Sequence, residues 1–186
     1  TVELMKMGEP GVPEMNDYIA DVLKSGMTLG FDGRVVSVGE GEAYADIAAA
    51  NGASVHYSDD LIDAIWEDRP ELSKKPAFAL GVEYTGESTV DKLKRIREEM
   101  AAEGANVHVL TSLDDINWTL NLRGDDIEFF PLLLSYAIIK MDCVEFYIDE
   151  SKLSDEIKAD LASNNVNLHP YNNIYEDVKA FGPETV

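Results

Sequence analysis

The side chains that most often bind metals or act in catalysis are few in this chain and lie far apart. Each of the three histidines, His56, His108 and His169, sits in a short β-like run, with no second histidine within one helical turn. Hydrolytic metal sites need several histidine, aspartate, glutamate or cysteine ligands brought together, often two on one helix or loop. The spacing therefore favours strand histidines near a sheet edge over metal ligands.

A nucleophilic site is also poorly supported. The single cysteine, Cys143, begins the apolar run 143–148, and no Gly-x-Ser-x-Gly elbow is present. We expect Cys143 to act as a small buried apolar residue. One cysteine cannot form a disulfide within the chain, which fits a reducing, cytoplasmic compartment. Neighbouring aspartates, such as Asp114 and Asp115, do not face each other on a helix and are better explained as caps and turns.

The negative charge of the chain limits the kinds of partner that it can bind. Its 36 acidic residues against 15 basic ones give a formal net charge of −21. Phosphate binding depends on clustered lysine and arginine, so neither nucleic acid nor an anionic membrane is an expected partner. No apolar run approaches the roughly 18 residues that a membrane-spanning helix needs.

Short β-like runs alternate with helical periodicity, which predicts an α/β fold with mixed sheets. Residues 68–76 contain two prolines and little periodicity, so we interpret them as a connector. The domain boundary is expected between residues 72 and 88. Strands are expected near residues 2–7, 28–31, 54–57, 77–80, 107–110, 132–140, 143–148 and 166–169. Helices are expected near residues 18–24, 42–51, 61–66, 89–103, 113–120, 155–162 and 174–180.

One polar and aromatic group lies within the mostly apolar stretch 114–139 and is our candidate for contacts with a cleft or another domain. It consists of Trp118, Asn121, Arg123 and Tyr136. The planar guanidinium of Arg123 could hold a carboxylate ligand. The alternative is an internal bond to Asp125, Asp126 or a nearby carbonyl. We expect no catalytic, cofactor-binding or metal-binding residue in this chain.

Several blocks resemble the three-domain Xaa-Pro aminopeptidases, also called aminopeptidase P. The most specific is the run LDDINWTLNLRG at residues 113–124. The segments at 4–8, 30–34, 61–70, 84–86 and 135–139 also match, in the family's order and over nearly the whole chain. The chain departs from the family at Asn117, Thr119 and Phe130.

The resemblance implies two creatinase N-terminal-like domains of ribonuclease H-like architecture, the first one incomplete. Residues 1–80 would be the later part of the first domain, and residues 81–186 the second. A carboxyl-terminal pita-bread domain holding two divalent ions, manganese or zinc, would follow Val186. The implied partners are that catalytic domain, a second copy in a homodimer, and short proline-containing peptides as substrates.

By this interpretation the chain is inactive alone, and it supplies subunit contacts and a wall of the substrate cleft. One alternative is a stand-alone acidic α/β binding module or pseudoenzyme partner. Another is a free-standing hydrolase with a triad formed only in space, for which the sequence offers no motif.

Overall fold

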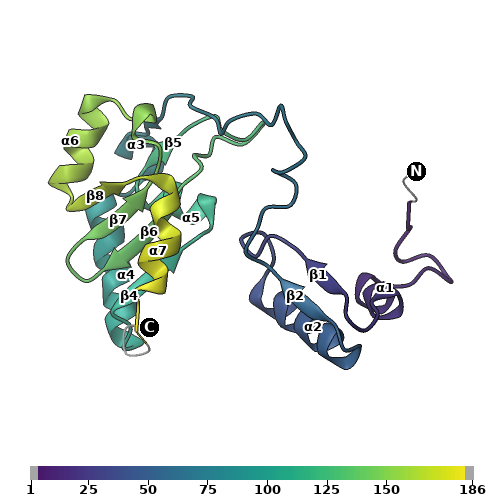
Figure 1. The fold of residues 1–186 in the computed structure, drawn as a ribbon. Coiled ribbons are helices and arrows are strands. Elements are labelled where there is room, and N and C mark those ends of the chain that lie inside the picture. The colour runs from purple at the N-terminus through teal and green to yellow at the C-terminus, as the bar shows by residue number, and fades with distance from the viewer. Residues whose placement is uncertain (1–3, 183–186) are drawn as a thin grey trace. The chain divides into compact units, whose positions relative to one another are not determined.

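The computed structural model describes residues 4–182 and divides into two compact units, residues 1–70 and residues 71–186 (Figure 1). Residues 69–77 form neither helix nor strand, as expected of a connector. The boundary expected at residue 80 lies inside the second unit. The reason is that Ala79 pairs with Leu122, and the Leu80 amide donates to the Asn121 carbonyl at 2.8 Å.

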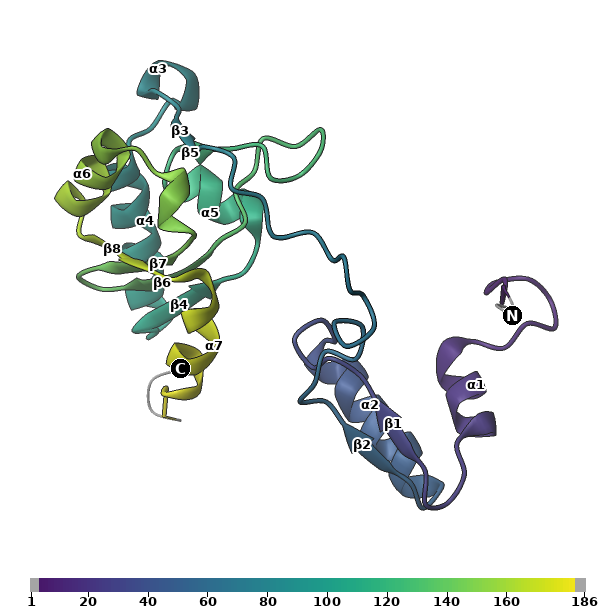
Figure 2. The ribbon, with the colours of Figure 1, turned by 45° about the horizontal axis from the view of Figure 1, so that its top comes forward.

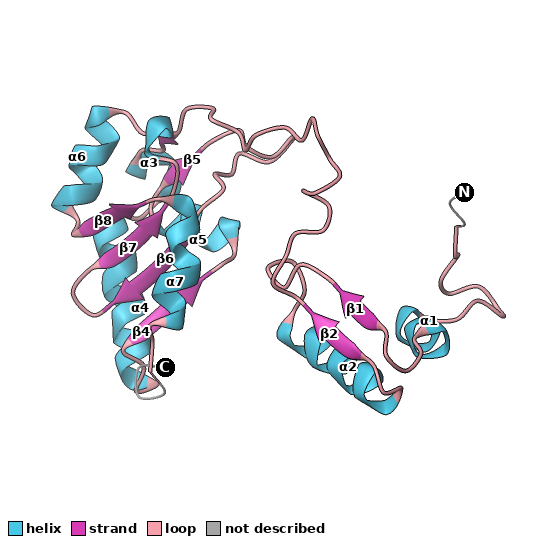
Figure 3. Cartoon of the chain, in the orientation of Figure 1, coloured by secondary structure: helices cyan, strands magenta, loops and turns pink. Residues whose placement is uncertain are grey.

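The first unit is a small β-α-β arrangement (Figure 3). Two parallel strands pair from Thr28 with Ser54 to Gly30 with His56, and a helix connects them, as parallel strands require. Ser37 and Glu40 form a reciprocal capping box at the start of this helix. The elements are α1 (Met15–Val22), β1 (Thr28–Gly30), α2 (Val38–Ala50) and β2 (Ser54–His56).

Two predictions of secondary structure in the first unit are wrong. Residues 61–65 form turns instead of a helix, and the Asp60 carboxylate accepts hydrogen bonds from the amides of Ile62 and Asp63, both at 3.0 Å. Residues 4–7 of the expected strand 2–7 pair with no other strand, and Gly8 directly after them has φ of 87°. Residues 2 and 3 lie outside the described residues.

The second unit is built on a four-stranded mixed sheet with the order β4-β6-β7-β8 (Figure 2). The first two pairings are antiparallel, and β7 and β8 are parallel. A second, two-stranded antiparallel sheet joins β3 to β5. The strands are β3 (Phe78–Ala79), β4 (Val107–Leu110), β5 (Leu122–Arg123), β6 (Tyr136–Lys140), β7 (Val144–Tyr147) and β8 (Val166–His169).

Helices cover both faces of the larger sheet, as Figures 1 and 2 show for α4 and α7. Leu93 of α4 and Ile157 of α6 join the larger apolar cluster with Ile139, whereas Ile174 of α7 packs with Ile138 on the other face. Burying β6 on both sides explains its continuous apolar run. The helices are α3 (Val82–Thr85), α4 (Thr89–Ala102), α5 (Leu113–Thr119), α6 (Asp155–Ser163) and α7 (Ile174–Lys179), with 3-10 turns η1 (Glu150–Lys152) and η2 (Tyr171–Asn173).

The predicted α/β class with mixed sheets is confirmed. Strand β6 begins at Tyr136, later than expected, because side-chain oxygens accept hydrogen bonds from the main-chain amides that precede it. The Leu133 amide donates to Asn117 and the Leu134 amide to Asp126. Within residues 4–182, none of the helices combines the length and the apolar character needed to cross a membrane.

A partly buried carboxylate, 13% exposed, joins three strands of the larger sheet. Glu145 of β7 accepts hydrogen bonds from Lys140 at 2.8 Å, from Asn167 at 3.0 Å and from His169 at 2.8 Å. Burial by itself would raise the pKa of Glu145, but the hydrogen bonds from Lys140, His169 and Asn167 outweigh it and lower the pKa to about 2.

This lowered pKa predicts acid-sensitive stability of the second unit. The ionised carboxyl stabilises the fold above its ordinary pKa of 4.5, and this contribution is lost as pH falls from about 4.5 toward 2. The contribution lost is on the order of 3 kcal/mol. We expect Glu145→Gln to flatten the decline in unfolding free energy between pH 5 and pH 3. Urea titrations followed by Trp118 fluorescence in a Trp66→Phe background measure it.

The matched control is Glu98→Gln, which removes a carboxylate that is 63% exposed on α4. It should keep the pH slope of the parent chain. Equal slopes for the parent and for Glu145→Gln would contradict the proposed role of this carboxylate.

Candidate functional site around Trp118 and Arg123

Helix α5 positions the candidate residues. It begins at Ser112, whose hydroxyl accepts a hydrogen bond from the Asp115 amide at 3.5 Å. Asp114 and Asp115 lie in its first turn, where the positive end of the helix favours carboxylates. Their interpretation as helix-start residues is confirmed.

The end of α5 is set by Asn121, which has φ of 54°. Asparagine tolerates this left-handed conformation better than most residues, and it lets the chain turn at once from α5 into β5. The side chain is held on both sides: its Nδ2 donates to the Glu87 carbonyl at 2.9 Å, and its Oδ1 accepts from Lys92 at 2.6 Å. Only 8% of Asn121 is exposed, so this residue is a structural support behind the surface.

Lys92 of α4 is the centre of this support. It is 1% exposed, and its Nζ donates to the Trp118 carbonyl at 2.7 Å as well as to Asn121. The same Nζ lies 4.3 Å from the centre of the Trp118 ring, which favours a cation over its face. Burial lowers the pKa of Lys92, Glu87 opposes this change, and Arg123 and Arg95 act in the same direction as burial. Trp118 is thereby fixed with 41% of its surface exposed.

Arg123 bonds to the main chain and not to an acid. Its Nη1 donates to the carbonyls of Asn117 and Leu122, both at 2.7 Å. Asp125 instead pairs with Lys75, and Asp126 pairs with Lys152. Of the internal bonds that the sequence allowed for Arg123, the structure has the one to nearby carbonyls. Within residues 4–182 no hydrogen bond from Nε or Nη2 of Arg123 is found, so these donors remain available.

Trp118 and Arg123 line one shallow pocket of about 400 Å³. Asp114 and Asp115 line it as well, and Phe130 belongs to its apolar side. The pocket therefore combines a guanidinium with spare N–H groups, an aromatic face and two carboxylates. Such a set can hold both ends of a small zwitterion or a peptide terminus.

The loop beside the pocket, residues 124–135, is anchored at its base and apolar at its tip. A Cβ on Gly124 would overlap the Leu133 side chain, so only glycine fits there. Asp126 accepts from Lys152 at 2.7 Å, with 0% and 2% of the two side chains exposed, and its Oδ1 has no partner among the described residues. At the tip, Phe129 has φ of 68° and is 89% exposed.

The structure brings together only part of the group suggested by the sequence. Trp118 and Arg123 share the pocket, and Asn121 lies behind them. Tyr136 lies elsewhere: its ring packs 5.1 Å from that of Tyr171, and its hydroxyl lies 3.3 Å from that of Tyr175. Tyr136 belongs to β6, where it packs with the smaller apolar cluster.

Sequence reasoning missed two lysines that hold this site, Lys92 and Lys152. A signal for Lys92 existed, since it follows Thr89 by three residues on the same helical face as Leu93 and Ile96. No comparable signal marked Lys152 as the partner of Asp126, because their pairing depends on how distant segments meet.

The remaining reactive side chains lie apart from the pocket. His56 contacts Asp59 at 2.7 Å, and His169 contacts Glu145. Burial, with added effects of Glu145 and Asp142, raises the pKa of Cys143 to about 11, which keeps this half-buried thiol protonated. Among residues 4–182, no group of three or more histidine, cysteine, aspartate or glutamate side chains is arranged to hold a metal ion.

Comparison with known proteins identifies the class to which this fold and site belong. Residues 68–185 match the family model of the creatinase/prolidase N-terminal domain, and the chain belongs to this family. The matched residues cover most of the second compact unit.

Longer matches extend over both units and confirm the resemblance to aminopeptidase P. The chain is 36% identical over 179 residues to a probable Xaa-Pro aminopeptidase P of Neurospora crassa, covering 95% of this chain and 26% of that protein. A probable Xaa-Pro aminopeptidase P of Pyricularia oryzae is 37% identical over 178 residues, with 94% and 29% covered. The chain thus matches the amino-terminal region of these enzymes and spans less than a third of their length.

A solved structure gives the same result. The crystal structure of X-prolyl aminopeptidase from Caenorhabditis elegans, described as a cytosolic enzyme with a di-nuclear active site, matches with a TM-score of 0.86 and 34% identity. The match covers 95% of this chain and 29% of that one. The stand-alone alternative is not favoured, because the proteins that resemble this chain are aminopeptidases.

The support beneath Trp118 can be tested with Lys92→Met. Removing the ammonium leaves the Trp118 carbonyl and the Asn121 Oδ1 without their buried donor, so we expect a loss of about 1–3 kcal/mol in unfolding free energy. Urea titration in a Trp66→Phe background measures it, with Trp118 emission as the signal.

Lys94→Met is the control, because this side chain is 73% exposed on the same helix. Its effect should stay within about 0.5 kcal/mol. If Lys92→Met were as stable as the parent chain and kept the same Trp118 emission, the buried ammonium would not be what holds the site.

Proposed function

We propose that this chain is the amino-terminal, non-catalytic part of a metal-dependent Xaa-Pro aminopeptidase. The observation that carries the proposal is the match of 95% of the chain to the amino-terminal region of such enzymes. In this proposal the complete enzyme removes the amino-terminal residue from short Xaa-Pro peptides in the cytosol. The two compact units correspond to its two creatinase N-terminal-like domains.

The role of the second unit is to form a wall of the substrate cleft. The pocket of Trp118 and Arg123 supports this role, because it offers an aromatic face beside unused guanidinium donors. A planar guanidinium can hold a carboxylate or carbonyl of a peptide, and an aromatic ring can stack on an apolar residue such as proline. The wall positions the peptide and excludes water; the bond is broken elsewhere.

The described residues do not fit a metal centre, as no three suitable ligands gather among residues 4–182. We therefore assign the two divalent ions, manganese or zinc, to the catalytic domain of the complete enzyme. When bound there, such ions would make a water molecule a better nucleophile and would polarise the peptide carbonyl. The first unit is assigned to subunit contacts in a homodimer.

Arg123→Ala in the complete enzyme tests the cleft role. We expect kcat/KM for an Xaa-Pro peptide to fall about 10- to 100-fold, the range for losing a charged hydrogen bond of about 1.5–3 kcal/mol. Loss of the two Nη1 bonds to carbonyls should also lower the unfolding free energy by about 1–3 kcal/mol, so activity is measured well below the melting temperature of the variant. Arg123→Lys should recover part of the loss.

The control for this variant is Lys94→Ala, which removes an exposed cation that does not line the pocket. It should leave kcat/KM unchanged. Unchanged kcat/KM for folded Arg123→Ala would rule out a contact between this pocket and the substrate.

An experiment with the isolated chain tests whether catalysis needs a domain outside these residues. We expect the purified 186-residue chain to release no amino-terminal residue from a Gly-Pro peptide with manganese or zinc added, because its described residues hold no metal ligand set. Amino-acid release measured by chromatography gives the answer. Release that is abolished by a chelator and grows in proportion to the chain would overturn the proposal.

A further inference from the structure

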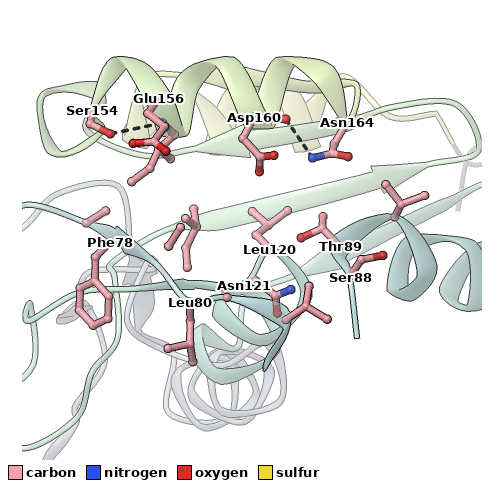
Figure 4. A pocket seen from close by; sticks show the side chains of 17 residues that line it. Phe78, Leu80, Ser88, Thr89, Leu120, Asn121, Ser154, Glu156, Asp160 and Asn164 are labelled. Carbon is pink, nitrogen blue, oxygen red and sulfur yellow. Dashed lines mark hydrogen bonds between the residues drawn. The ribbon is translucent and has the colours of Figure 1, made fainter. Parts of the chain in front are cut away.

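The second unit contains another concave site, which has no part in the proposed function. It is a groove of about 810 Å³ between helix α6 and the segment 77–82. The start of α4 closes one end. The groove shares no lining residue with the pocket of Trp118 and Arg123. Figure 4 shows Asp160 pointing from α6 toward the opposite wall, which carries Phe78, Leu80 and Thr89.

One wall of the groove contains the unpaired edge of β3. In an antiparallel pair, successive residues alternate between facing the partner strand and facing away. The Leu80 amide donates to the Asn121 carbonyl, so Ala79 faces away from β5. The next residue on this edge, Ala77, bonds to the Lys152 carbonyl at 2.9 Å. Within residues 4–182 neither the amide nor the carbonyl of Ala79 has a hydrogen-bond partner.

A second polar group directed at the groove also lacks a partner. Thr89, the first residue of α4, is only 8% exposed and lines the groove. No hydrogen bond to its hydroxyl is found among the described residues, and Figure 4 shows this hydroxyl turned toward the groove. The hydroxyl is not among the fully buried side-chain atoms that lack a partner, so solvent or a ligand in the groove can bond to it.

The charged side chains that line the groove are all acidic. Glu156 and Asp160 line it, no lysine or arginine does, and neither acid belongs to an ion pair within residues 4–182. The two acids are four residues apart on α6, so they lie on one face about 6 Å apart along the helix axis. Alternate residues of an extended strand are about 6.8 Å apart. Phe78, Val82 and Val90, between 49% and 57% exposed, provide apolar contacts.

We propose that this groove binds an extended peptide segment with basic residues at alternate positions, which adds to the free edge of β3. The peptide main chain pairs with the amide and carbonyl of Ala79. Its two basic side chains face Glu156 and Asp160, and its apolar side chains cover Val82 and Val90. Addition of a strand to an open sheet edge is a common mode of peptide binding.

The geometry supports a basic peptide over an anionic ligand. The groove has two carboxylates and no cation, in a chain with a net charge of −21, so an anion would be repelled. This proposal does not depend on the aminopeptidase assignment.

Binding can be measured with the isolated chain and a labelled probe peptide, acetyl-Val-Lys-Val-Lys-Val-amide, by fluorescence anisotropy at low salt. The comparison peptide carries glutamate in place of both lysines. We expect the lysine peptide to bind at least tenfold more tightly than the glutamate peptide. Glu156→Gln with Asp160→Asn should weaken the lysine peptide about five- to tenfold, as two exposed ion pairs are lost.

The matched control is Glu150→Gln with Asp155→Asn, which removes the same charge outside the groove. It should change affinity less than twofold. Amide exchange gives a readout without mutation: the Ala79 amide should exchange more slowly when the lysine peptide is bound. Equal binding of both peptides, an equal loss in the control variant, or unchanged exchange at Ala79 would overturn the proposal.

Discussion

The arrangement of the second unit depends on how the ammonium of Lys92 is hydrogen-bonded inside the protein. A buried charge is tolerated only when its hydrogen-bonding capacity is satisfied. Two acceptors and one ring do this: the Trp118 carbonyl at the negative end of α5, the Oδ1 of Asn121 just beyond it, and the face of the Trp118 ring. The bonds fix α4 against the turn that leads from α5 into β5.

That turn separates two surfaces with different chemistry. On one side, Trp118 and Arg123 present an aromatic face and free guanidinium donors in the smaller pocket. On the other, Asn121 and Leu122 belong to the wall of the acidic groove beneath α6. A single left-handed asparagine thus contributes to the geometry of both surfaces. Both surfaces are concave and lie in the second unit, where we propose that they contact peptides.

Much of the second unit follows from local sequence signals. Ser88 and Ser112 mark the starts of α4 and α5, and β4 and β8 have the bounds that their apolar runs predict. Where distant groups compete for a segment, local signals fail. Asn117 and Asp126 delay the start of β6. The two-residue strand β5 carries too little pattern to be recognised.

The α/β class and the resemblance to aminopeptidase P could be inferred without coordinates, because they depend on short-range periodicity, capping residues and a continuous motif. The folded chain was needed to show that Tyr136 lies apart from Trp118, that Arg123 bonds to carbonyls, and that Lys92 and Lys152 are buried. Burial and hydrogen-bond partners depend on which distant segments meet, and spacing along the chain does not contain that information.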